Sequence, residues 1–208
     1  MPCIILFSSC TKSITGEGAM VNETRNIPAF TGIKLEGSGN VEIQQGSIQS
    51  VHVSGYANLV QIYSTFVSGG MLVLKFEENN NIRKNNVKTT IVVPDLTSVQ
   101  IHGSGGIQVN GFANAGNFSA SIEGSGKIVL TGSVFTKLAT SINGSGDIDA
   151  KDSPAPEVKV DINGSGYIAV NCLQQLNARI SGSGDVEYWG NPTVNADISG
   201  SGKVKKRA

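Results

Sequence analysis

The three-residue unit Gly-Ser-Gly recurs along this chain and limits what it can fold into more than any other feature. Successive units are separated by 66, 21, 20, 20, 18 and 18 residues, counted between their first glycines, which are Gly37, Gly103, Gly124, Gly144, Gly164, Gly182 and Gly200. Internal repetition at a period near twenty residues is typical of solenoids, in which each repeat forms one turn that packs on its neighbours.

The residues on either side of each unit alternate between apolar and polar. The second residue before and the fourth residue after the first glycine are aliphatic in every repeat: Leu35, Ile101, Ile122, Ile142, Ile162, Ile180 and Ile198, then Val41, Ile107, Ile128, Ile148, Ile168, Val186 and Val204. The positions between them are mostly polar and variable. A period of two is typical of a strand with one buried face. The sequence therefore predicts an all-β fold, a single-stranded β-helix-like solenoid with turns of about 18–21 residues.

Two conformations of the Gly-Ser-Gly unit agree with this alternation, because both glycines occupy positions that the alternation assigns to the buried face of the strand. Either the strand continues with bare backbone turned inward, so that the opposite wall approaches closely, or the chain bends in conformations that glycine adopts at low cost. In stacked turns the serines would form a column with a spacing of about 4.8 Å. We interpret this column as structural rather than catalytic.

The N-terminal segment indicates where the protein resides. Residues 1–10 read M-P-C-I-I-L-F-S-S-C, which resembles the end of a bacterial lipoprotein signal peptide with Cys10 as the acylated residue. A complete signal peptide begins with a positively charged segment, but residues 1–9 contain no Lys or Arg. We expect residues 11–25 to be a linker, and the localisation to be the cell envelope, as an outer-membrane lipoprotein that meets the membrane only through this anchor.

Residues 26–208 are predicted to form one solenoid domain. Within it, residues 100–208 carry regular Gly-Ser-Gly turns, whereas residues 26–99 read as degenerate turns in which the strand pattern persists without the signature between Gly37 and Gly103. A separate small sheet formed by residues 44–99 and packed on the solenoid is the alternative.

Charge and residue usage exclude several function classes. The chain has 16 basic and 16 acidic residues, so the basic excess that marks a nucleic-acid-binding protein is missing. With only two histidines and no C-x-x-C motif, the chain has few of the residues that bind zinc.

Calcium-binding β-rolls need an aspartate in every turn, and Lys127 and Lys203 stand at the corresponding position here. We therefore expect neither a metal nor a cofactor, and interpret Cys172 as a small buried hydrophobe near a corner.

Parallel β-helices also carry polysaccharide lyases and hydrolases, which need converging carboxylates. Stacking could bring Asp149 and Glu187 within reach of each other two turns apart. The serines lack the G-x-S-x-G spacing of a nucleophile elbow. A carbohydrate-active enzyme therefore remains the alternative to a non-enzymatic binding module.

Candidate contact residues lie in two places. The polar stretch Glu77–Lys88 is predicted to be an exposed loop, and binding residues concentrate on such loops, which makes Arg83 and Lys84 candidates. Tyr167 and Trp189 are the aromatic side chains that could stack on sugar rings.

Several motifs resemble the auto-transporter adhesin head (GIN) domain family: the Gly-Ser-Gly turns, F-T-G-I-K-L at Phe30–Leu35, G-G-M-L-V-L at Gly69–Leu74 and V-P-D-L at Val93–Leu96. The resemblance covers residues 26–206. It implies a β-solenoid domain of bacterial cell-envelope proteins with an adhesin-like role, and it carries over no catalytic or binding residue. The expected partner is a cell-surface glycan or protein, and copies could associate through a turn face or an end.

Overall fold

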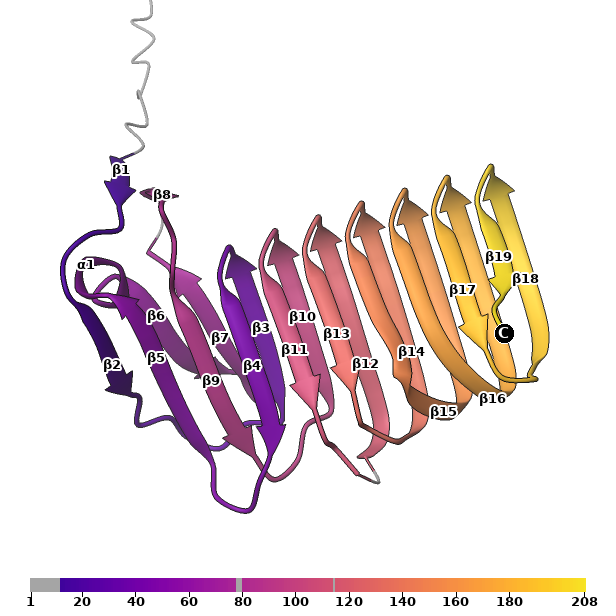
Figure 1. Ribbon diagram of the computed structural model, residues 1–208, viewed down its shortest axis with the longest axis horizontal. Helices are drawn as coiled ribbons and strands as arrows, with labels where there is room; N and C mark the ends of the chain where they lie inside the picture. Colours follow the sequence, from indigo (N-terminus) through magenta and orange to yellow (C-terminus); the bar gives the residue numbers. More distant parts are fainter. Residues whose placement is uncertain (1–11, 78–79, 114) are drawn as a thin grey trace, which may run out of the picture.

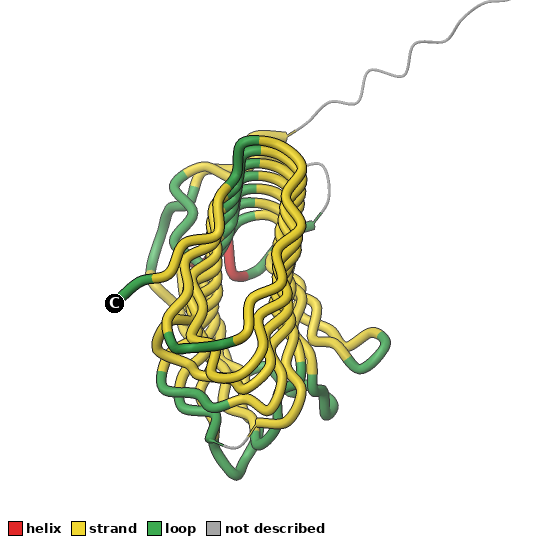
Figure 2. Tube along the Cα trace, turned by 90° about the vertical axis from the view of Figure 1, so that its right-hand side faces the viewer, coloured by secondary structure: helices red, strands yellow, loops and turns green. Residues whose placement is uncertain are grey.

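The computed structural model describes residues 12–77, 80–113 and 115–208, and in these ranges most of the chain is β-strand. One short helix, α1 (Ala57–Val60), interrupts the strands. The strands wind into an elongated solenoid, seen from the side in Figure 1 and along its axis in Figure 2. The predicted all-β solenoid is therefore confirmed. Cys10, the predicted acylation site, lies outside the described residues.

Each regular turn consists of two strands on opposite faces of a flattened tube (Figure 2). We call the face formed by strands that precede a Gly-Ser-Gly unit face A, and the face formed by strands that follow it face B.

Face A contains, in spatial order, β6 (Tyr63–Ser68), β7 (Met71–Phe76), β3 (Gly32–Gly37), β10 (Ser98–Gly103), β12 (Ala115–Gly124), β14 (Phe135–Gly144), the second half of β15 (Asp147–Gly164), the second half of β16 (Tyr167–Gly182) and β18 (Thr193–Gly200). Face B contains β2 (Met20–Thr24), β5 (Ser50–Tyr56), β9 (Lys88–Val93), β4 (Asn40–Gln45), β11 (Gly106–Asn110), β13 (Lys127–Thr131), the first halves of β15 and β16, β17 (Asp185–Trp189) and β19 (Lys203–Lys206).

The register places equivalent residues of successive turns directly above one another. Ile142 pairs with Ile162, and Ile162 pairs with Ile180, so the aliphatic positions form continuous columns inside the tube. These side chains are at most 2% exposed, and burying each one stabilises the fold by about 1.5–3 kcal/mol. In the last turn Ile198 is 40% exposed, because no further turn covers it.

The Gly-Ser-Gly unit forms the bend that connects face A to face B, and it is also a point of close approach between turns. The first glycine of the unit at Gly144 has a φ of 132°, and a Cβ there would lie 2.4 Å from the carbonyl oxygen of Gly124. A Cβ on the second glycine, Gly146, would lie 2.7 Å from the carbonyl oxygen of Gly126 and 2.8 Å from Cγ2 of Ile122. The second interpretation therefore holds: the chain bends at the unit, and the close approach is to the preceding turn rather than to the opposite wall.

The N-terminal region departs from simple winding. Strands β7 and β9 continue the parallel faces beyond β3 and β4, and β5 and β6 pair antiparallel with them, so that each face gains a further strand. The helix α1 lies between β5 and β6 in the chain and buries Leu59 and Val60. Residues 44–99 thus extend both faces of the solenoid, partly with antiparallel strands. From β9 the chain passes to β10, which lies on the other side of β3.

The segment 11–25, expected to be a linker, contains two strands. Strand β1 (Lys12–Thr15) pairs with β8 (Asn80–Arg83) in a small separate sheet, and β2 pairs antiparallel with β5. These strands have mostly exposed side chains, so no buried period-two pattern marked them in the sequence.

Candidate functional site

The four predicted contact residues do not form one site. Arg83 ends β8 and Lys84 follows it with a φ of 50°, both exposed near the N-terminal end of the solenoid. Tyr167 begins β16 and Trp189 ends β17, both half-buried near the other end. The two pairs are therefore separated along the tube axis (Figure 1).

Tyr167 belongs to a network that ties the last turns together. Its hydroxyl donates a hydrogen bond to Oε2 of Glu187 over 2.9 Å, and the Arg207 guanidinium forms an ion pair with the same carboxylate. Desolvation, together with the neighbouring Glu187 carboxylate, raises the pKa of Tyr167 to about 12. The phenol is thus engaged within the protein.

The carboxylates considered for catalysis are engaged as well. Asp149 and Glu187 lie in one face-B column with Ala169 between them. Asp149 lies 3.4 Å from the Lys151 ammonium, and a hydrogen bond from Arg207 lowers the pKa of Glu187. A general acid in glycoside hydrolysis needs a raised pKa, so the Glu187 environment favours the opposite protonation state.

Other chemistry is sparse in the part of the chain that the structure describes. There, no group of three or more His, Cys, Asp or Glu side chains could hold a metal ion, and no helix is long and apolar enough to cross a membrane. Cys172 is fully buried, as expected, and this burial raises the pKa of its thiol.

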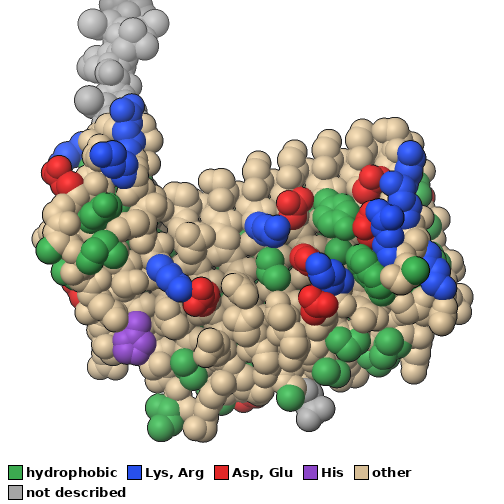
Figure 3. Space-filling view, viewed as in Figure 1, with side chains coloured by type: hydrophobic (Ala, Val, Ile, Leu, Met, Phe, Trp, Pro, Cys, Tyr) green, Lys and Arg blue, Asp and Glu red, His purple; other side chains and the backbone are tan. Residues whose placement is uncertain are grey.

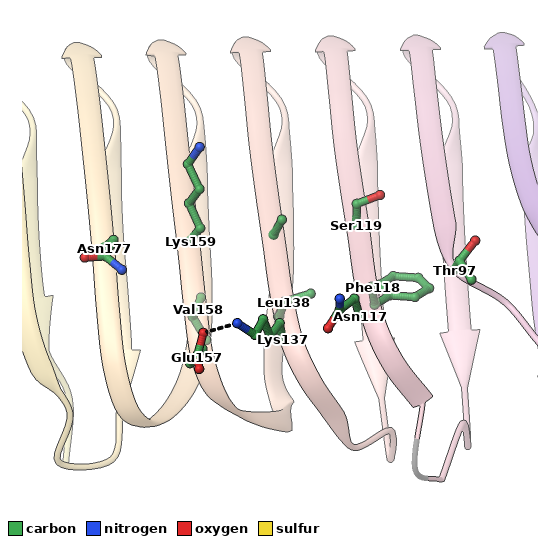
Figure 4. A pocket seen from close by; sticks show the side chains of 11 residues that line it. Thr97, Asn117, Phe118, Ser119, Lys137, Leu138, Glu157, Val158, Lys159 and Asn177 are labelled. Carbon is green, nitrogen blue, oxygen red and sulfur yellow. Dashed lines mark ion pairs between the residues drawn. The ribbon is translucent and has the colours of Figure 1, made fainter.

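Face A carries a groove that runs along the solenoid axis from β10 to β16, with a volume of about 390 Å³ (Figure 4). We call it the lateral groove. Its floor follows one outward column, in which short side chains in the first turns give way to longer polar ones: Ser98, Ser119, Ala139, Lys159, Asn177 and Asn195. Two further depressions on face A share Lys159 with the lateral groove and extend it along the sheet.

The charges along the lateral groove are mostly neutralised. The Lys137 ammonium lies 2.8 Å from the Glu157 carboxylate (Figure 4). Lys159 makes no ion pair with any carboxylate of residues 12–77, 80–113 and 115–208. The groove thus offers hydroxyl and amide groups and one unpaired ammonium, while the core residues Phe118 and Leu138 lie buried beneath its floor.

Sequence reasoning missed the lateral groove, although a signal was present. The fifth position before the first glycine holds Ser98, Ser119 and Ala139 in consecutive turns, and a run of short outward residues in stacked strands implies a depression. The members of this column lie 18 to 21 residues apart in successive turns, so their convergence depended on the register.

The fold and its surfaces define a class of protein, a repeat-built β-solenoid that presents extended outward faces. More specifically, the chain belongs to the family described as "Putative auto-transporter adhesin, head GIN domain", whose profile matches residues 29–192. The family resemblance noted in the sequence is thereby confirmed.

Solved structures share this fold. A putative adhesin from Bacteroides fragilis aligns with a TM-score of 0.75 at 20% identity, covering 93% of this chain and 100% of that one. A putative lipid binding protein from Parabacteroides distasonis aligns with a TM-score of 0.65 at 23% identity, covering 95% and 100%. A putative adhesin from Parabacteroides merdae aligns with a TM-score of 0.54 at 20% identity, covering 95% and 100%. At these identities the likeness establishes the fold alone.

A comparison with curated protein sequences finds no significant match. The family points to a protein of the cell surface or envelope.

Proposed function

We propose that this protein is a non-enzymatic, adhesin-like binding module that contacts an extended cell-surface polymer, a glycan or a protein, through the lateral groove. The observation that carries the proposal is the groove itself, which repeats outward polar groups at the strand spacing of about 4.8 Å across consecutive turns. Weak contacts that repeat along a polymer add up through effective concentration.

The groove also suits a linear partner because it is open along the axis and its floor is shallow. Ser119 and Ala139 are exposed and short, so a chain lying over them can approach the sheet while Lys137, in the neighbouring outward column, reaches its side. The paired carboxylates on face B give the enzyme alternative no comparable support.

A binding array of glycans and cell-surface extracts tests this function. Ala139→Trp fills the groove floor and Lys159→Gln removes its unpaired ammonium, while Lys151→Gln on face B serves as a matched control. We expect both groove variants to reduce binding and the control to retain it. Equal binding by all three variants would contradict the role of the groove.

A polysaccharide-degradation screen run alongside separates binding from catalysis. Turnover of any glycan that is lost in Asp149→Asn or Glu187→Gln, with circular dichroism unchanged, would show an enzyme instead of a binding module.

We further propose that the mature protein is an outer-membrane lipoprotein acylated at Cys10. The support is the L-F-S-S-C sequence at Leu6–Cys10 together with the envelope character of the family. Labelling with radioactive palmitate in a bacterium, with Cys10→Ser as the control, tests it. We expect label in the membrane fraction that the substitution abolishes; unlabelled protein in the cytoplasm would refute the anchor.

A further inference from the structure

Face B has a notch at Gly106, where one turn lacks an outward side chain. Gly106 pairs in register with Asn40 on one side and with Lys127 on the other, so it is a gap in an otherwise occupied column. The resulting depression has a volume of about 540 Å³, within the range of about 300–1,000 Å³ common for ligand sites. We call it the Gly106 notch.

The lining of the notch combines three kinds of groups. Asn40 and Gln108 supply amides, Ser104 and Ser125 supply exposed hydroxyls, and half-buried Val129 supplies an apolar patch. This combination fits a sugar ring, which has polar hydroxyls around its edge and apolar C–H groups on its faces.

The notch carries one excess positive charge. The Lys88 ammonium lies 2.7 Å from the Glu42 carboxylate, and this pair is neutral as a whole. Lys127 is exposed and makes no ion pair with any carboxylate that the structure describes, although Asp147 pairs with it in register on the next turn. Figure 3 shows this face, with charged side chains on either side of an uncharged stretch over β11.

The backbone of the notch decides which anion fits. Phosphate sites in proteins commonly use free backbone N–H groups arranged as a nest. Here the N–H of Gly106 donates to the Gly39 carbonyl over 2.8 Å, and the N–H of Lys127 donates to the Gly105 carbonyl over 3.0 Å. The ladder between turns has already used these donors, so a single ammonium remains for a single negative charge.

We propose that the Gly106 notch binds an acidic sugar residue of a polysaccharide, with its carboxylate paired to Lys127 and its hydroxyls bonded to Asn40 and Gln108. This site lies on the face opposite the lateral groove and goes beyond the proposed function, because it assigns a ligand class to a different surface. It does not require the lateral groove to bind anything.

Titration calorimetry of the full-length protein with two acidic oligosaccharides, oligogalacturonate and hyaluronan fragments, tests the proposal. The methyl esters of the same oligosaccharides isolate the contribution of the carboxylate. We expect the wild type to bind at least one acid about tenfold more tightly than its ester, which corresponds to about 1.4 kcal/mol, and to lose this preference at high salt.

Two variants disturb the notch in different ways. Lys127→Gln removes the cation and should bring the acid to the affinity of the ester. Gly106→Asn fills the gap with the side chain that the neighbouring turn carries as Asn40. The fold should accept it, since no positive φ is required at Gly106 and a Cβ there would lie 3.1 Å from Oδ1 of Asn40, a side-chain atom that can shift slightly, and 4.0 Å from the carbonyl oxygen of Lys127.

Lys203→Gln, in the same outward column at the far end of face B, is the matched control and should bind within about twofold of wild type. Circular dichroism checks the fold of each variant. The proposal is overturned if neither acid binds, if acid and ester bind equally, or if Lys127→Gln and the control behave alike. Ala139→Trp in the lateral groove should leave this binding unchanged, so a failure of the notch and a failure of the groove are distinguishable.

Discussion

Replacing Gly144 by alanine should destabilise the solenoid far more than replacing the adjacent serine. Gly144 has a φ of 132°, a region that costs a residue with a Cβ about 1–3 kcal/mol. The new methyl group would also lie 2.4 Å from the carbonyl oxygen of Gly124, which accepts the hydrogen bond from the N–H of Ser145 at 2.9 Å. Displacing that carbonyl loses about 0.5–1.5 kcal/mol more.

The two contributions together predict a loss of about 1.5–4.5 kcal/mol in the free energy of unfolding. Domains of this kind are stable by only about 5–15 kcal/mol, so the change is large. Guanidinium unfolding followed by far-ultraviolet circular dichroism measures it, and the m value shows whether the transition keeps its cooperativity.

Two control variants separate the causes. Ser145→Ala alters an exposed side chain at the same bend and should change the free energy of unfolding by less than about 0.5 kcal/mol. Gly132→Ala introduces a Cβ at a φ of 61° with no atom within 4 Å, so it should cost only the conformational term of about 1–2 kcal/mol. If Gly144→Ala costs no more than Gly132→Ala, close approach between turns is not what requires glycine at this position.

Three further measurements test the packing and the charges. Ile148→Ala removes a fully buried side chain from an inner column and should lower the free energy of unfolding by about 2–5 kcal/mol, whereas a change below 1 kcal/mol in guanidinium unfolding would contradict the inward assignment. Because the pKa of Tyr167 is raised in the folded state to about 12, from about 10 when unfolded, its contribution to stability is complete below pH 10 and is lost between about pH 10 and pH 12. Tyr167→Phe should therefore flatten this part of the profile of melting temperature against pH, and an unchanged slope would refute the assignment. The buried Cys172 thiol should react with a thiol reagent only after denaturant is added; rapid reaction of the native protein, compared with Cys172→Ala, would contradict its burial.

Much of the fold could be read from the sequence because its determinants are local. In every turn but the last, the aliphatic positions two before and four after the first glycine of the Gly-Ser-Gly unit are buried in the structure, as period-two alternation requires. The period near twenty residues indicated the stacking of turns. The interpretation of Cys172 as a small buried hydrophobe is confirmed as well.

The direction of the strands between Gly37 and Gly103 was not encoded in the same way. Strand β5 alternates like the regular strands, yet it pairs antiparallel with β9. Side-chain alternation is the same in parallel and antiparallel strands, so it could not distinguish a degenerate turn from an antiparallel extension of the sheet.

The sequence by itself determined a β-solenoid, its inner columns and its family, because repeated local patterns specify which side of each strand is buried. Only the tertiary structure decided how the surface is organised. It engaged the Tyr167 hydroxyl with Glu187, separated Arg83 and Lys84 from Trp189, and placed Lys127, Asn40 and Gly106 around one notch. These arrangements depend on register between residues that are twenty to nearly ninety positions apart, and a column of neighbours exists only once the turns are stacked.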